Sequence, residues 1–277
     1  MFPLEYSQSL GSSLQAILFD WAGTVIDHGS RAPVLAVMQA FESLDVPISV
    51  DEARGPMGRA KREHIEAILA LPRVAVQWQA RRGTAPDVAA VDLVYRRFLA
   101  DQARILVEHA ELIPGCLEAI AACRRRGLQI GSSTGYTAEL MELLIPAAGR
   151  QGLRFDAVLC ADDVPKGRPA PWMCWENLRR LGVYPAFRAA VVDDTPVGVE
   201  AARNAGMWAI GVTRTGNLVG LSREGFESLP ATEQRERLLA AAAEFKAAGA
   251  HATVESVANL EPVLDAIDAA LAEGRRP

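Results

Sequence analysis

The sequence predicts an α/β fold, in which helices cover both faces of a parallel sheet and a block of helices is inserted after the first strand. Two observations favour this fold. Short apolar runs typical of buried strands alternate with segments of helical periodicity, as in βαβ units. The stretch from His28 to Val107, by contrast, has helical periodicity only. The chain has 277 residues, half of them hydrophobic, which is enough for one large domain or two smaller ones.

The order of the expected elements divides the chain into two parts. Strands are expected over Ala16–Phe19, Leu128–Ser132, Ala157–Cys160, Ala189–Val192, Trp208–Val212 and Ala252–Val254. Helices between and after them are expected over Gly115–Arg126, Ala138–Ala148, Trp172–Leu181, Val197–Ala205, Leu238–Ala250 and Ser256–Ala272. Inside the inserted block, helices are expected over Arg31–Leu44, Lys61–Leu71 and Pro86–Val107. Such a block is typical of a lid over the end of the first strand, so we expect an α/β core of residues 14–27 and 108–277 and a cap of residues 28–107.

Composition narrows the class of protein. A net charge of -5 and a pI near 5.5 argue against binding to nucleic acid or acidic membranes. No apolar stretch approaches the ~18 residues of a membrane span, and Met1–Ser13 lacks the pattern of a secretory signal and is expected to be a disordered lead-in. The cysteines lack metal-site spacing, which favours reduced thiols in a cytoplasmic protein: Cys116, Cys123, Cys160 and Cys174.

Asp20 stands at the end of the first expected strand, followed by Trp21-Ala22-Gly23-Thr24. Parallel sheets present their reactive groups at this carboxyl edge. Enzymes that transfer phosphoryl groups through an aspartate on this framework usually carry a second Asp two positions later, which protonates an oxygen leaving group. Here that position is Ala22. The sequence therefore predicts a leaving group that no carboxylic acid needs to protonate.

Lys61 is expected on the apolar side of a helix. At ~100° per residue, Lys61, Ile65 and Ile68 share one stripe with Met57 and His64 at its margin, and the other charged residues fall on the opposite side. One interpretation is a lysine whose stem lies along apolar surface while its amine reaches water. The other is a desolvated lysine with a lowered pKa, able to attack a carbonyl as a neutral amine. The periodicity leaves both open.

Three more polar segments follow expected strands or turns. Thr134 is placed either to donate to phosphate or to cap the next helix. Arg168, flanked by prolines, is either a phosphate clamp or a surface cation. Asp193 and Asp194 are costly at the end of a buried strand unless a cation or donors satisfy them, the alternative being a helix cap. Together with Asp20 they form an oxygen-rich site that suits Mg²⁺.

In this order the segments resemble the four signature motifs of the haloacid dehalogenase superfamily. The motifs are Phe19–Thr24, Gly131–Tyr136, Arg168–Pro171 and Asp193-Asp194. The helical block is similar to the C1 cap of that superfamily, and its core is Rossmann-like. Within it the chain most resembles the phosphonoacetaldehyde hydrolases (phosphonatases), from Gln15 to about Ile267. That likeness is carried further by Gly55–Lys61, Thr134–Thr137, Asp162–Cys174 and Arg203–Trp208.

The resemblance implies hydrolysis of the C–P bond of phosphonoacetaldehyde, a small molecule, to acetaldehyde and phosphate. Lys61 would form a Schiff base with the aldehyde, and Asp20 would attack phosphorus to give an aspartyl phosphate. Position 22 needs no acid, because the departing atom is carbon and its electrons flow to the imine. Arg168 and Thr134 would neutralise charge on the transferring group.

The resemblance also implies a magnesium site and supporting residues. Asp20, the Ala22 carbonyl and Asp194 would hold Mg²⁺. Many family members carry a further Asp four residues after the fourth-motif Asp, where this chain has Gly198, and Asp193 is the candidate to replace it through a bound water.

Three further residues, Met57, His64 and Tyr136, match positions near the substrate or supporting the lysine. Lys166 is a competitor for the clamp role, and Arg168 is preferred because it occupies the basic position before Pro-x-Pro. Family members are commonly dimers through the cap, so a homodimer is expected.

Other activities remain as alternatives. A 2-haloacid dehalogenase also lacks the second Asp, but it works without a metal, which the pair Asp193-Asp194 and the inward-facing Lys61 disfavour. A phosphosugar phosphatase or mutase relies on the acid that Ala22 replaces. A catalytically inactive binding protein is disfavoured because the reactive residues are all present. Loss of activity with a chelator distinguishes the first alternative, and any turnover excludes the last.

Overall fold

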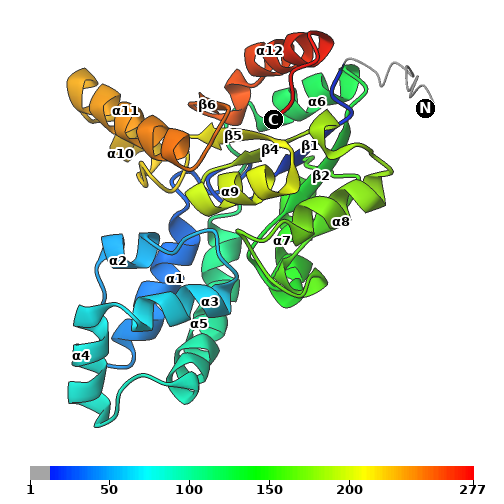
Figure 1. Ribbon diagram of the computed structural model, residues 1–277. Coiled ribbons are helices and arrows are strands. Elements are labelled where there is room, and N and C mark those ends of the chain that lie inside the picture. The colour runs from blue at the N-terminus through cyan, green and yellow to red at the C-terminus, as the bar shows by residue number, and fades with distance from the viewer. Residues whose placement is uncertain (1–12) are drawn as a thin grey trace, which may run out of the picture.

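The computed structural model describes residues 13–277. The lead-in expected over Met1–Ser13 lies, apart from Ser13, outside the described residues. The strands form one six-stranded parallel sheet in the order β3-β2-β1-β4-β5-β6 (Figure 1). Their bounds are β1 Ala16–Phe19, β2 Gln129–Ser133, β3 Ala157–Leu159, β4 Ala189–Asp193, β5 Trp208–Val212 and β6 Ala252–Val254.

The register of the three central strands aligns their carboxyl ends. Phe19 of β1 lies opposite Ser132 of β2 and Val192 of β4. The residues that follow Phe19, Ser132 and Val192 therefore emerge side by side, since parallel strands end at the same edge. This register brings the first, second and fourth motifs together at one edge.

Helices cover both faces of the sheet, as alternating side chains of β1 show. Ile17 and Phe19 pack in one cluster with the helices α6 (Cys116–Arg125), α7 (Ala138–Arg150) and α12 (Glu261–Ala272). Leu18 packs on the other face with α8 (Trp172–Leu181), α9 (Pro196–Ala205) and α11 (Ala231–Ala247). The short helix α10 (Arg223–Glu227) precedes α11. The expected α/β fold class is confirmed.

The chain between β1 and α6 forms a separate group of helices, drawn in blue to cyan and green in Figure 1. It holds α1 (Arg31–Glu42), α2 (Val50–Arg54), α3 (Lys61–Leu69), α4 (Pro72–Arg82) and α5 (Val88–Glu108). We call these five helices with their connections the helical block. Its own core is apolar, with Phe41 of α1 and Phe98 of α5 fully buried. The inserted all-helical unit expected after the first strand is present.

Several elements differ from the prediction. The helices α2, α4 and α10 were not expected, because two have five residues each and α4 buries only Val74 and Trp78. The helix α3 begins at Lys61 as expected, so Met57, counted at the margin of the helical stripe, lies in the turn before it. The segment 256–272 is divided into a 3-10 turn (Val257–Asn259) and α12, whose first turn contains a proline.

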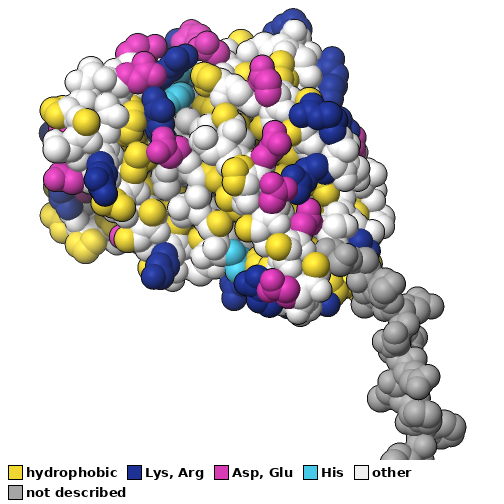
Figure 2. Space-filling view, turned by 90° about the horizontal axis from the view of Figure 1, so that it is seen from above, with side chains coloured by type: hydrophobic (Ala, Val, Ile, Leu, Met, Phe, Trp, Pro, Cys, Tyr) yellow, Lys and Arg dark blue, Asp and Glu magenta, His cyan; other side chains and the backbone are white. Residues whose placement is uncertain are grey.

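The surface and the helices give two further findings. Seen from above, basic and acidic side chains are interspersed over the face in Figure 2. Among residues 13–277, no helix is both long enough and apolar enough to cross a membrane.

Candidate active site

A small cavity of about 290 Å³ lies where the helical block meets the carboxyl edge of the sheet. The core and the block both contribute side chains to it. Its lining comprises Asp20, Ala22, Ser30, Pro33, Met57, Gly58, Arg59, Lys61, Thr134, Gly135, Tyr136, Arg168, Asp194 and Thr195. Eight of the ten residues singled out from the sequence are in this set. His64 and Asp193 do not line the cavity, although each lies directly behind a residue that does.

Arg168 is fixed at the bottom of the site by hydrogen bonds on both of its terminal nitrogens. Nη1 donates to Oδ1 of Asp20 at 2.7 Å and lies 3.1 Å from Oδ2 of Asp193. Nη2 donates to the carbonyl and the hydroxyl oxygen of Ser133, both at 2.8 Å. Arg168 is 3 % exposed, whereas Lys166 is exposed. The guanidinium of Arg168 therefore faces the Asp20 carboxylate, whereas Lys166 lies at the surface.

Three buried carboxylates converge beside this arginine. Oxygens of Asp20, Asp193 and Asp194 lie within 4.8 Å of one another. Burial raises the pKa of Asp20 to about 7; Arg168 lowers it, and Asp193 raises it. Burial also raises the pKa of Asp194, and the charges of Asp20 and Asp193 add to the rise. Three carboxylates around one guanidinium leave an excess of negative charge in a desolvated place, so this all-oxygen cluster fits a hard divalent cation.

Asp193 occupies the space of a side chain at position 198. A Cβ built on Gly198 would lie 2.0 Å from Cγ of Asp193. The carboxylate is held there because the backbone N–H and hydroxyl of Thr195 donate to Oδ1 at 2.9 and 2.7 Å. The carboxylate of Asp193 thus occupies the volume that a side chain at position 198 would need.

Asp194 points toward the turn that follows β1. The backbone N–H of Asn217 donates to its Oδ2 at 2.8 Å. A Cβ on Gly23 would lie 2.1 Å from the same oxygen, and Gly23 has φ +76°, so only glycine allows this approach. The first residue of α9 follows Thr195, which caps that helix, so neither Asp193 nor Asp194 serves as the cap.

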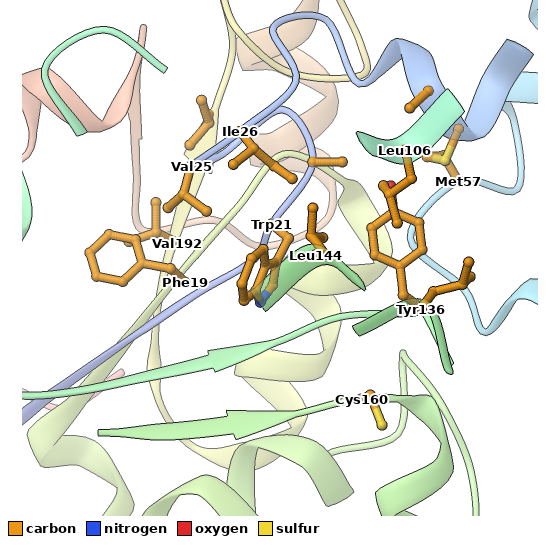
Figure 3. Close-up of a cluster of buried hydrophobic side chains, with 14 of the residues drawn as sticks. Phe19, Trp21, Val25, Ile26, Met57, Leu106, Tyr136, Leu144, Cys160 and Val192 are labelled. Atoms are coloured by element: carbon orange, nitrogen blue, oxygen red, sulfur yellow. The ribbon is translucent and has the colours of Figure 1, made fainter. Parts of the chain in front are cut away.

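Lys61 enters the cavity from the helical block. It is 6 % exposed, and its Nζ lies 4.0 Å from Sδ of Met57 and 5.0 Å above the centre of the Tyr136 ring. Figure 3 shows that ring beside Met57 and Leu106. The amine is thus enclosed and does not reach out to water. Burial lowers the pKa of Lys61 to about 8, while Asp20 and Asp194 raise it. At pH 7 about a tenth of such amines are neutral, some hundreds of times more than for an ordinary lysine.

His64 stands behind Lys61 on the same helix. Its Nε2 lies 2.8 Å from the carbonyl oxygen of Ala53, so this nitrogen carries the proton and donates. Burial, together with the charge of Lys61, lowers the pKa of His64 to about 3. The ring is therefore neutral, and it ties the start of α3 to α2.

Thr134 and Tyr136 border the cavity at the end of β2. The Thr134 hydroxyl accepts from the backbone N–H of Tyr136 at 3.2 Å. The cap of α7 is Thr137, which leaves the hydroxyl proton of Thr134 free for another acceptor. Burial raises the pKa of Tyr136, and its hydroxyl has no hydrogen-bond partner among the described residues.

Sequence reasoning missed three residues of this site. Ser133 accepts from Arg168, Asn217 orients Asp194, and Ser30 lines the cavity with a left-handed backbone (φ +49°). Ser133 lies within the second motif and could have been included. Ser30 and Asn217 lie in loops without a motif, and only the tertiary structure reveals them.

Comparisons with known proteins agree with this geometry. Residues 14–206 match the model of the haloacid dehalogenase-like hydrolases. The phosphonoacetaldehyde hydrolase of Paraburkholderia phytofirmans is 45% identical over 264 residues, which cover 95% of this chain and 99% of that protein. That of Nitratidesulfovibrio vulgaris is 43% identical, over 100% of this chain and 99% of that protein.

A solved structure gives the same relationship. The crystal structure of a phosphonoacetaldehyde hydrolase-like protein from Oleispira antarctica matches with a TM-score of 0.94 and 38% identity, covering 95% of this chain and 96% of that one. A structural relative at 20% identity, a β-phosphoglucomutase-type protein from Bacteroides vulgatus with a TM-score of 0.65, shows the fold alone. The chain therefore belongs to the phosphonoacetaldehyde hydrolase family, within the haloacid dehalogenase-like hydrolases.

Proposed function

We propose that this protein hydrolyses the carbon–phosphorus bond of phosphonoacetaldehyde to give acetaldehyde and phosphate. Near full-length relatives bear the name of this activity. The observation that carries the proposal is one cavity lined by the carboxylate of Asp20 from the sheet, the amine of Lys61 from the helical block, and Ala22 where an acid would stand. An amine activates the aldehyde and a carboxylate receives the phosphoryl group.

The first step is formation of an imine. The neutral amine of Lys61 adds to the aldehyde carbon, and loss of water gives a C=N bond whose nitrogen is then protonated. The lowered pKa of Lys61 supplies the neutral amine at ordinary pH. The protonated imine draws electrons from the neighbouring C–P bond.

The second step transfers the phosphoryl group to Asp20. A carboxylate oxygen of Asp20 attacks phosphorus, the C–P bond breaks, and its electron pair forms the C=C bond of an enamine on Lys61. Because the departing atom is carbon, a methyl group at position 22 suffices. Water then cleaves the aspartyl phosphate to phosphate, the enamine carbon takes up a proton, and a second water releases acetaldehyde and the free amine.

Side chains that line the cavity would neutralise the negative charge of the transferring phosphoryl group. Arg168 and Thr134 are the proposed donors to the phosphoryl oxygens. Mg²⁺ is the proposed cation, held by Asp20, the Ala22 carbonyl and Asp194, with Asp193 behind them. When bound, it supplies positive charge against the phosphoryl oxygens. A chelator should abolish turnover and added Mg²⁺ should restore it; full activity after exhaustive chelation would contradict the metal assignment and favour dehalogenase-like chemistry.

The remaining assignments are proposals of the same kind. Met57 and Tyr136, which lie beside the Lys61 amine, would contact substrate, and His64 would support Lys61 from behind. Residues 28–107 would act as a cap on a core of residues 14–27 and 108–277. A homodimer is inferred from the resemblance and a cytoplasmic location from the reduced cysteines, and light scattering of the purified protein tests the dimer.

Borohydride trapping tests the central step. The chain has three lysines, Lys61, Lys166 and Lys246, so peptide mass analysis assigns an adduct without ambiguity. Borohydride added with phosphonoacetaldehyde should leave a reduced N-ethyl or N-phosphonoethyl group on Lys61. Lys61→Arg should abolish both trapping and turnover. An adduct confined to Lys166 or Lys246, or full activity of Lys61→Arg, would refute the mechanism.

A further inference from the structure

Arg54, the last residue of α2, joins the helical block to loops outside it. Its Nη1 donates to the Gly29 carbonyl at 2.9 Å and to Oδ1 of Asn217 at 3.0 Å. Its Nη2 donates to the carbonyl of Gly220 at 2.8 Å. Among residues 13–277, no carboxylate pairs with this guanidinium within 4.0 Å. The guanidinium instead donates to neutral oxygens from the chain that follows β1 and from the loop that follows β5.

The core loop is shaped to receive this side chain. Gly220 has φ +68°, and a Cβ there would lie 2.7 Å from Cζ of Arg54. Any other residue would therefore be strained and would strike the guanidinium. The contact is reciprocal, since Nδ2 of Asn217 lies 3.4 Å from the carbonyl oxygen of Arg54.

The same loop reaches the carboxylate cluster. The backbone N–H of Asn217 donates to Asp194, so Arg54, Asn217 and Asp194 form a continuous hydrogen-bonded chain. On its other side, the Arg54 carbonyl accepts from the backbone N–H of Met57, in the turn that leads to Lys61. Arg54 is thus bonded both to the turn that precedes the reactive amine and to the loop that orients a carboxylate.

The boundary between the helical block and the core, which we call the seam, is tightly packed near this contact. A Cβ on Gly58 would lie 2.3 Å from Oγ1 of Thr195, and one on Gly135 would lie 2.4 Å from the carbonyl oxygen of Arg59. Such approaches leave no room for water at these two points. Substrate and product nevertheless have to pass, so the seam has to open in each cycle.

We propose that Arg54 is a positioning residue that latches the helical block onto the strand edge and keeps water from the amine of Lys61 between substrate entry and product release. Its hydrogen bonds to Asn217 and Gly220 form only when the seam is closed, and through Asn217 they stabilise the orientation of Asp194. Because coupling of this kind is reciprocal, any contact that fixes the orientation of Asp194 also favours the closed position of the helical block. The benefit for catalysis rests on the proposed function, whereas the latch itself is a property of the closed fold.

Amine labelling tests the latch without any turnover. A bulky acylating reagent reaches Lys61 only when the seam is open, and the exposed Lys246 serves as an internal reference. In Arg54→Ala, labelling of Lys61 relative to Lys246 should accelerate about ten-fold or more, since each hydrogen bond from a charged donor changes an equilibrium by roughly that factor. Arg54→Lys, which makes fewer of these bonds, should lie between it and the unaltered protein.

A matched control removes the same charge elsewhere in the block. Arg104 of α5 pairs with Glu108 on its own helix, so Arg104→Ala should leave Lys61 labelling and turnover unchanged. If Arg54→Ala does not fold, as judged by circular dichroism, Asn217→Ala removes one acceptor and should still raise labelling. Unchanged Lys61 labelling in folded Arg54 and Asn217 variants would overturn the latch.

Kinetics separate this proposal from the function it rests on. With phosphonoacetaldehyde, Arg54→Ala should lower kcat/KM by about ten- to a hundred-fold, and Arg54→Lys should recover part of the loss. Absence of turnover in the unaltered protein, with latch-dependent labelling intact, would refute the proposed function and leave the latch standing. Unchanged kinetics in Arg54→Ala with increased labelling would refute the catalytic role of the latch.

Discussion

The carboxylate of Asp193 fills the volume that a side chain at Gly198 would need, with the built Cβ of residue 198 only 2.0 Å from Asp193 Cγ. The two positions therefore cannot both carry a carboxylate without rearrangement. We expect that one acidic group, placed at either position, completes the negative site beside Asp194.

This exclusion predicts the outcome of a double replacement. Gly198→Asp alone should lower the melting temperature, because it forces two carboxylates into one space. Asp193→Gly alone should weaken Mg²⁺ binding, measured by calorimetry, by about ten-fold or more, as for other supporting groups of metal sites. Combining the two changes should recover most of the affinity. A double variant that binds Mg²⁺ no better than Asp193→Gly would show that the positions are not interchangeable.

Ala22 predicts which leaving groups the site accepts. Ala22→Asp should introduce an acid and permit hydrolysis of glycolaldehyde phosphate, in which an oxygen atom stands between the methylene carbon and phosphorus. General acids contribute factors of about 10²–10⁴, so a gain of at least ten-fold over the unaltered protein is expected. Phosphonoacetaldehyde turnover should fall at the same time. Ala22→Asn, of similar size without the acid, is the control, and an equal gain there would contradict the argument.

The lowered pKa of Lys61 predicts the acidic limb of the pH profile. Because the neutral amine reacts, kcat/KM at saturating Mg²⁺ should rise with pH and level off above about pH 8. At pH 6 it should be about a hundred-fold below the plateau. Steady-state rates between pH 5.5 and 9 check this. A rate that decreases between pH 6 and 8 would require a protonated Lys61 and contradict the mechanism.

His64 predicts a loss of stability in acid. Its pKa is about 3 in the folded protein against 6.5 ordinarily, so between these values the unfolded chain binds the extra proton. Stability should therefore fall as pH decreases from about 6.5 toward 3, by about 2 kcal/mol at pH 5 from this group alone. Urea unfolding at pH 7 and pH 5 measures the slope. His64→Gln keeps a donor for the Ala53 carbonyl and should reduce the difference; an unchanged slope would assign it to other groups.

The strands and the reactive residues were largely predictable, and the reason is physical. Buried parallel strands such as Trp208–Val212 are apolar throughout, and turns that carry charge, such as Asp193-Asp194, interrupt that pattern visibly. Lys61 stood out because one charge lay in an apolar stripe, and the structure confirms that this stripe is buried. The roles of these residues in catalysis stay predictions.

What the sequence did not reveal depends on contacts between distant segments. The helix α2 has only five residues, too few for periodicity, and is stabilised by a capping box between Ser49 and Glu52. Arg54 resembles any exposed arginine until the loop around Gly220 is seen to enclose it. Asn217 orients Asp194 through its backbone N–H, which no side-chain pattern records.

The beginning of α3 has one more consequence. Lys61 is its first residue, so the amine belongs to the turn where unpaired N–H groups concentrate the positive end of the helix macrodipole. Ala60, the residue just before, provides no side-chain acceptor, and its methyl group lies against Gly167. A conventional Asp at that point would strengthen the helix by about 1 kcal/mol and would add a negative charge that favours the ammonium form. Ala60 adds no such charge beside the proposed nucleophile.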